Sequence, residues 1–230
     1  MKTLIAIVNA RHREEWRQVV RNTWLPQVPK DKCDAFFFMG RGEERQFSED
    51  EVELDCSDKY EHLPEKVRAI TRWALKRTYG HMLKCDDDVV LRPNAILASG
   101  YESYDFSGKA NRPPQPYVVS FGFNYWLSRK SMEIVAESEL PTDGSNDDEK
   151  WVAKTLWDHS ISLHNDSRYR LHTGGEVYPD TGFRRALRVP RVMSSVRDPE
   201  MLARCIHMDG ASQELKLREF QTVFLKYGEK

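Results

Sequence analysis

The stretch "HMLKCDDDVV", His81 to Val90, places three consecutive aspartates directly after a short apolar run. Carboxylates between apolar segments are costly unless a counter-charge or a metal ion compensates them. A helix cap or a solvated turn is the alternative, because aspartate is common in both. The apolar residues on both sides of the aspartates favour a counter-charge or a metal ion over a solvated turn.

The pattern around the aspartates predicts an α/β fold. Strand-like apolar runs at 3–9, 33–40, 52–55 and 81–85 alternate with helical patterns at 14–25 and 63–80. Strands separated by helices indicate a Rossmann-like, mostly parallel sheet with helices on both faces. In such sheets ligands bind at the carboxyl ends of the strands, and the triple aspartate lies at one of these ends.

The second half of the chain has a less regular pattern. We expect a loop over 100–116, and then a strand, a glycine turn and a strand over 117–128. Helices are predicted over 128–140, 147–159 and 212–228, with a strand over 203–208. Because no internal repeat or low-complexity linker is present, we predict a single domain over 1–230.

Composition and charge exclude several classes of protein. The chain has 35 lysines and arginines against 36 aspartates and glutamates, so no nucleic-acid-binding tail is indicated. Its four cysteines contain no C-x-x-C pair, which argues against a zinc ribbon or a disulfide framework. The N-terminal apolar run is too short for a signal peptide, and no window approaches a membrane span. These features predict a cytoplasmic protein with no membrane span.

The spacing of the aspartates indicates a metal site. Alternate residues of a strand share one side, so Asp86 and Asp88 could hold an ion while Asp87 faces away. A few hard oxygen ligands suit Mg²⁺ or Mn²⁺, completed by water and by substrate phosphates. Two chemistries use such a pair: phosphatases whose aspartate attacks phosphorus, and enzymes whose metal stabilises the departing diphosphate of a nucleotide-sugar. The motif follows three predicted strands, and this position favours the second chemistry.

Five motifs in order resemble glycosyltransferase family 31, which contains β-1,3-galactosyltransferases, N-acetylglucosaminyltransferases and Fringe. They are "RQVVRNTWL" (17–25), "FFFMG" (36–40), "DCSDKYEHLPEKVRAITRW" (55–73) followed by "LKCDDDVVL", "YVVSFGFNYWLS" (117–128) and "DDEKWVAKTL" (147–156). The resemblance implies a GT-A fold with a nucleotide-binding part over about 1–100 and an acceptor-side part over about 101–230. It also implies a UDP-type nucleotide-sugar donor, a Mn²⁺-type metal and inverting transfer. The acceptor would be a hydroxyl on a glycan or another molecule, modified DNA included.

The sequence also departs from this family. It has no membrane anchor and lacks the family's cysteine pattern, "LPEK" replaces "LTLK", and the E-D-V element is altered. A bacterial or viral origin would explain the missing anchor. Two alternatives stay open at this point: a Mg²⁺-dependent phosphatase or nucleotidyltransferase, and a non-catalytic glycan-binding relic.

Site residues follow from aligning these motifs. For the metal we expect Asp88 as the direct ligand, Asp86 on the ion or the ribose, and His207 as a further ligand, preferred over His164 and His172. For the donor we expect contacts from Asp86, Asp87, Arg17, Arg21, Lys66, Gly122 and Asn124. Surface ion pairing is the alternative for the three cations, and a simple turn is the alternative for the glycine.

The catalytic base is expected at the start of the helix over 147–159. An inverting displacement needs a carboxylate near the acceptor hydroxyl, on the opposite side of the sugar from the diphosphate. The motif alignment places Glu149 on the family's catalytic aspartate, with Asp148 as the alternative. A role as helix N-cap competes for Asp147 and Asp148, and the helix dipole is expected to lower the pKa of a carboxylate there.

Overall fold

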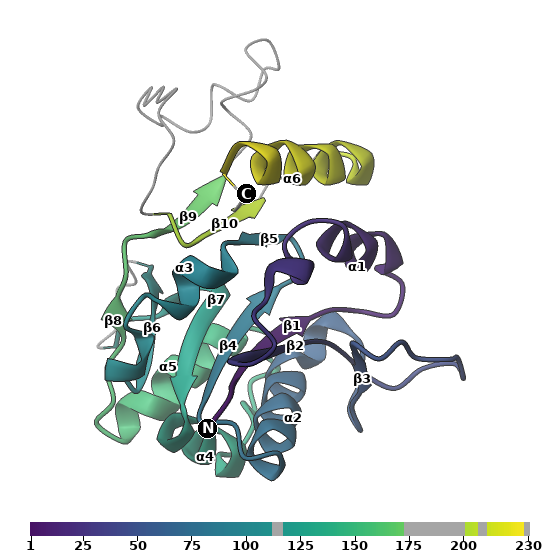
Figure 1. The fold of residues 1–230 in the computed structure, drawn as a ribbon. Coiled ribbons are helices and arrows are strands. Elements are labelled where there is room, and N and C mark those ends of the chain that lie inside the picture. The colour runs from purple at the N-terminus through teal and green to yellow at the C-terminus, as the bar shows by residue number, and fades with distance from the viewer. Residues whose placement is uncertain (112–116, 173–200, 207–210, 228–230) are drawn as a thin grey trace.

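A mixed seven-stranded sheet forms the centre of the part of the chain that the structure describes (Figure 1). This structure is a computed structural model, and it describes residues 1–111, 117–172, 201–206 and 211–227. The sheet has the order β3-β2-β1-β4-β7-β6-β8. Its strands are β1 (Thr3–Val8), β2 (Cys33–Met39), β3 (Glu51–Glu53), β4 (His81–Asp86), β6 (Phe106–Ala110), β7 (Ser120–Ser128) and β8 (His164–Asn165).

Strands β3, β2, β1 and β4 run parallel, whereas β7 is antiparallel to both β4 and β6. A smaller sheet with the order β5-β10-β9 lies beyond the carboxyl end of β4 (Figure 1). It consists of β5 (Val89–Leu91), β10 (Ala203–Ile206) and β9 (Tyr169–His172). The predicted mixed, mostly parallel α/β fold is therefore confirmed.

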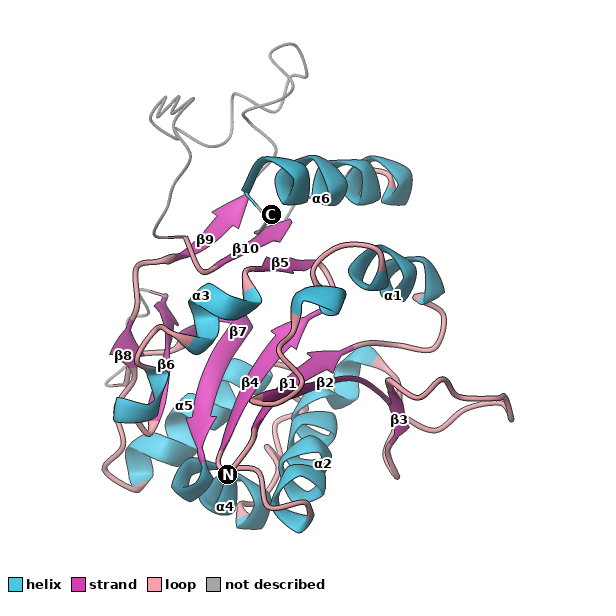
Figure 2. Cartoon of the chain, viewed as in Figure 1, coloured by secondary structure: helices cyan, strands magenta, loops and turns pink. Residues whose placement is uncertain are grey.

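Helices cover both faces of the main sheet, as Figure 2 shows. They are α1 (Glu14–Arg21), α2 (Leu63–Lys76), α3 (Pro93–Leu97), α4 (Arg129–Glu137), α5 (Asp148–Asp158) and α6 (Gln213–Tyr227), with short 3₁₀ turns η1 (Leu25–Gln27), η2 (Tyr60–His62) and η3 (Tyr101–Ser103). Side chains of α1, α3 and α6 pack in one apolar cluster, and those of α2, α4 and α5 pack in another. Because β1 is buried along its whole length between these clusters, it reads as one continuous apolar run.

Two expectations about the middle of the chain were wrong. The predicted loop over 100–116 contains β6, whose polar, glycine-containing sequence "FSGKA" gains its strand conformation by pairing with β7. The predicted glycine turn at Gly122 is absent, because β7 continues through it as one strand. In both places the pairing with neighbouring strands outweighs the local preference of the residues.

No helix of the described residues is long and apolar enough to cross a membrane. Cys33, Cys56 and Cys85 are buried free thiols. Burial raises the pKa of Cys56 to about 11, so its thiol stays protonated at neutral pH.

Candidate active site

The triple aspartate forms the turn between the two sheets. β4 ends at Asp86, and Asp87 and Asp88 lead directly into β5 of the small sheet. The backbone carbonyl of Asp88 accepts a hydrogen bond of 3.0 Å from the N–H of Ile206 in β10. The turn is thus held at the carboxyl edge of the main sheet, where parallel strands present their ligand-binding loops.

Asp87 is buried and faces the loop between β1 and α1. Asn9 donates from Nδ2 to Oδ2 of Asp87 over 2.5 Å, and Arg13 donates from Nε to the same oxygen over 2.6 Å. A second guanidinium nitrogen of Arg13 binds the other oxygen. Burial disfavours the charged guanidinium, but the hydrogen bond and charge of Asp87 outweigh it and raise the pKa of Arg13. Both oxygens of Asp87 are engaged, so this carboxylate anchors the turn to the β1 loop.

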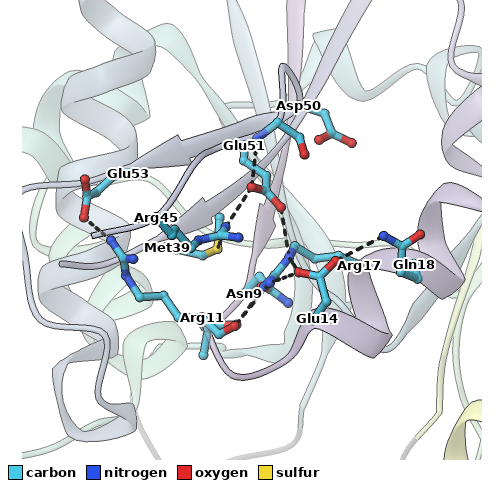
Figure 3. A network of polar contacts seen from close by, with 12 residues as sticks. Asn9, Arg11, Glu14, Arg17, Gln18, Met39, Arg45, Asp50, Glu51 and Glu53 are labelled. Atoms are coloured by element: carbon cyan, nitrogen blue, oxygen red, sulfur yellow. Dashed lines mark hydrogen bonds and ion pairs between the residues drawn. The ribbon is translucent and has the colours of Figure 1, made fainter. Parts of the chain in front are cut away.

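Arg17 lies at the centre of a polar network between α1 and β3 (Figure 3). Its side chain is 1% exposed, contacts the side-chain oxygen of Asn9 and pairs with Glu51 at 3.0 Å. Glu51, also 1% exposed, contacts Arg21 at 2.8 Å and Arg45 at 2.7 Å. The predicted donor-binding residues Arg17 and Arg21 therefore hold α1 against β3. Arg17 also orients Asn9, which donates to Asp87.

Lys66 is a second buried cation, in the first turn of α2. Its Nζ donates to the carbonyl of Asn9 over 3.0 Å and to Oδ1 of Asp58 over 2.7 Å. Asp58 also accepts the backbone N–H of Gly40, at the end of β2, over 2.7 Å. A Cβ at Gly40 would lie 2.5 Å from the carbonyl carbon of Ser57, so only glycine fits this approach. Lys66 thus fixes the loops that follow β1 and β2.

Lys84 connects the triple aspartate to α5 on the opposite face of the sheet. Its side chain is 2% exposed, and the ammonium lies 2.8 Å from Asp86 and 3.6 Å from Asp148. Asp148 also accepts a hydrogen bond of 2.8 Å from the hydroxyl of Tyr125 in β7. Partial burial and the charge of Asp148 raise the pKa of Asp86 to about 6, against the opposing effect of Lys84.

Glu149 lies beside this group, in the first turn of α5. The N-cap is Asp147, whose Oδ1 accepts the N–H of Lys150 over 2.9 Å, so Asp148 and Glu149 are not needed for capping. Burial and the charge of Asp148 raise the pKa of Glu149 to about 8, although Lys84 lowers it. The expectation that the helix start would lower this pKa was wrong, because burial and Asp148 outweigh the favourable helix terminus.

Tyr60 in η2 is an exposed aromatic residue beside these carboxylates. Its side chain is 68% exposed. Partial burial of the hydroxyl, followed by the charges of Glu149, Asp148 and Asp86, raises the pKa of Tyr60. The Tyr60 hydroxyl is therefore within electrostatic range of these carboxylates, and most of its side chain is exposed to solvent.

The remaining predicted site residues lie in or beyond β7. Asn124 is fully buried opposite Cys85 of β4, and no described residue hydrogen-bonds its amide nitrogen or oxygen. Gly122 lies two residues earlier in the same strand. His207, the predicted third metal ligand, lies outside the described residues.

The donor set fits a small, hard cation. Within the described ranges, no three His, Cys, Asp or Glu side chains form a preformed metal cage. Mg²⁺ and related ions are commonly held by one or two carboxylates together with water and substrate phosphates. Asp86, whose side chain is 38% exposed, and the partly buried Asp88 at the same turn supply such oxygens. Asp87, by contrast, is already bound to Asn9 and Arg13.

The structure brings Asp86, Asp148 and Glu149 together through a residue that sequence reasoning missed, Lys84. The sequence did contain a signal for Lys84. Because Lys84 precedes Asp86 by two residues in the same strand, the two side chains lie on the same side of the sheet. Asn9 was also missed, although it directly follows β1, the strand next to β4.

Comparison with known proteins concerns the family and the fold of the chain. Residues 15–110, which include the triple aspartate, Arg17, Lys66 and Lys84, match the family model described as "Galactosyltransferase". The chain is a glycosyltransferase. The match confirms the family resemblance over the motifs that lie within residues 15–110.

The fold of this glycosyltransferase is similar to a solved glycosyltransferase involved in the glycosylation of the major capsid of PBCV-1. The two share 11% sequence identity with a TM-score of 0.52, over 97% of this chain and 100% of the other. No curated protein matches the chain in sequence.

Proposed function

We propose that this glycosyltransferase moves a sugar from a UDP-type nucleotide-sugar to an acceptor hydroxyl, with a divalent metal ion and with inversion. The observation that carries the proposal is the group formed by Asp86, Lys84, Asp148 and Glu149. It places a carboxylate of raised pKa beside a turn that offers oxygen ligands, as metal-assisted displacement requires. The acceptor hydroxyl would belong to a glycan or a comparable molecule.

Asp88 and Asp86 would hold Mn²⁺ or Mg²⁺ at the donor diphosphate, where the ion supplies charge stabilisation of the leaving group. Asp87 would keep the turn in place through Asn9 and Arg13. Lys84 would keep Asp86 and Asp148 close together despite their like charges. Donor contacts from Arg17, Arg21, Lys66, Gly122 and Asn124, and a metal contact from His207, stay predictions.

Glu149 would act as the base. Its carboxylate accepts the proton of the acceptor hydroxyl while that oxygen bonds to the anomeric carbon and the bond to the diphosphate breaks. A pKa of about 8 makes Glu149 a stronger base than an ordinary glutamate once it is ionised. The exposed ring of Tyr60 beside it would stack against the acceptor.

Titration calorimetry with UDP, with and without Mn²⁺, tests the metal assignment. Wild type should bind UDP more tightly with Mn²⁺, and Asp88→Ala should lose that gain. Asp31→Ala, which removes an exposed carboxylate elsewhere on the chain, is the matched control and should bind as wild type does.

Equal Mn²⁺-dependent affinity in Asp88→Ala would overturn the metal assignment. Phosphate release from simple esters, without turnover of any nucleotide-sugar, would instead establish phosphatase chemistry and overturn the proposed transfer.

A further inference from the structure

A polar cavity lies at the β6–β8 edge of the main sheet, away from the triple aspartate. Its volume is about 210 Å³. Ser107 of β6 is in register with Trp126 of β7, which is in register with Leu83 of β4. That register separates the cavity from Asp86 by two strand spacings and three residues, roughly 14 Å. The lining residues are Ser99, Gly100, Tyr101, Ser103, Tyr104, Ser107, His164, Asp166 and Arg168.

Ser107 gives this cavity a polar floor. The residue is 3% exposed and lines the cavity, yet no group of the described residues hydrogen-bonds its hydroxyl. Buried hydroxyls nearly always have a hydrogen-bond partner, so this one is suited to a molecule that enters the cavity.

An ion pair on one wall supplies donors and acceptors without net charge. Arg168 pairs with Asp166 at 2.7 Å and also donates to the carbonyl of Ser99 over 3.0 Å. Asp166 additionally accepts the N–H of Arg168 over 3.0 Å. Because the two charges cancel locally, this wall favours a neutral polar ligand over an anion.

The rim of the cavity is aromatic. The rings of Tyr104 and His164 stack with centroids 3.6 Å apart and planes inclined by 7°. Tyr104 is 39% exposed, so the stacked pair presents apolar ring surface at the entrance. A flat ring beside a few placed polar groups is the arrangement that holds a molecule with one apolar face and several hydroxyls.

We propose that this cavity binds one neutral pyranose unit of a glycan. The sugar's hydroxyls would meet Ser107 and the Asp166–Arg168 pair, and its C–H face would pack on the Tyr104–His164 stack. The site would hold a glycan chain at a second point on the protein. Binding here requires neither metal nor nucleotide, so the inference stands independently of the proposed transfer.

Saturation-transfer NMR with the methyl pyranosides of galactose, glucose and N-acetylglucosamine tests the proposal on the full chain. At least one should receive saturation from wild type without UDP or Mn²⁺, and it should shift the backbone amides of Gly100 and Gly108. Tyr104→Ala should abolish the signal. Ser107→Ala, which removes one hydrogen-bonding hydroxyl, should weaken affinity about 2- to 10-fold.

Trp157→Ala is the matched control, because it removes a similarly exposed aromatic ring, 43% exposed, from α5. It should bind the sugar as wild type does. The proposal is overturned if none of the three sugars binds, or if Tyr104→Ala and Ser107→Ala both bind with wild-type affinity. Sugar binding that is unchanged in Asp88→Ala, while this variant loses the Mn²⁺-dependent gain in UDP affinity, would support the separation of this cavity from the triple aspartate.

Discussion

On the α1 side of the triple aspartate, Asp87 receives hydrogen bonds from Asn9 and Arg13, and the buried Glu51 nearby meets three guanidinium groups. On the α5 side, the ammonium of Lys84 is shared between Asp86 and Asp148, while Glu149 adds a further carboxylate. On the α1 side, buried carboxylates are therefore paired with guanidinium groups. On the α5 side, three carboxylates share one ammonium, which leaves an excess of negative charge.

The difference in charge between the two sides affects the pKa values of the carboxylates. On the α5 side, burial and neighbouring charges raise the pKa of Asp86 to about 6 and that of Glu149 to about 8. Groups whose pKa is displaced towards neutrality are suited to proton transfer, whereas paired groups hold structure. The comparison therefore supports the proposal that the α5 side carries the chemistry, while the contacts of the α1 side anchor the turn.

The largest expected effect is on the α5 side. Glu149→Gln should keep UDP binding but lower kcat about 10²- to 10⁴-fold, the range for loss of a general base. Glu133→Gln, an exposed glutamate of α4, is the control in the same assay. If Glu149→Gln were fully active and Asp148→Asn inactive, the base would be Asp148. Full activity in both variants would remove the proposed mechanism.

The next effect should be a loss of stability on the α1 side. Arg17→Met removes a buried cation and leaves Glu51 with less compensation, so unfolding in urea should show a loss of about 3–5 kcal/mol. The folded Arg17→Met variant should keep the wild-type pH dependence of kcat/KM, since Arg17 does not face Glu149. A changed pH profile with unchanged stability would reverse the roles given to the two sides.

A third effect concerns the pH dependence of transfer. Glu149 acts when deprotonated, so kcat/KM should rise with pH, be half-maximal near pH 8 and level off above it. Lys84 lowers the pKa of Glu149, and Lys84→Met should therefore move this rise to higher pH. Lys84→Arg, which keeps the charge, is the control. A Lys84→Met profile that coincides with wild type would show that Lys84 does not act on the base.

The smallest effect should come from an exposed member of the α1 network. Glu14 pairs with Arg17 and Arg21, but its side chain is 50% exposed. Glu14→Gln should cost less than about 1 kcal/mol in the same urea experiment, because solvent screens the pair. If Glu14→Gln lowered the free energy of unfolding as much as Arg17→Met, exposure of a side chain would not distinguish stabilising contacts from weak surface contacts.

Much of the fold could be predicted because its signals are local. The apolar run of β1, the helical period of α2 and the strand that ends at Asp86 each carry their pattern within a few residues. β6 could not be found this way, since a short polar strand such as "FSGKA" depends on hydrogen bonds to β7. Its pairing is a long-range property that local propensity does not encode.

The features of the candidate site can likewise be divided into those that the sequence determined and those that depend on the tertiary structure. The sequence by itself determined the triple aspartate at a strand end, the helix that carries Asp148 and Glu149, and the glycosyltransferase family that these motifs indicate. Only the tertiary structure decided that Arg17 and Lys66 are buried anchors, that Lys84 lies between Asp86 and Asp148, and that the pKa of Glu149 is raised. Burial and distances between remote segments set the energy of each charge, and these arise when the chain folds.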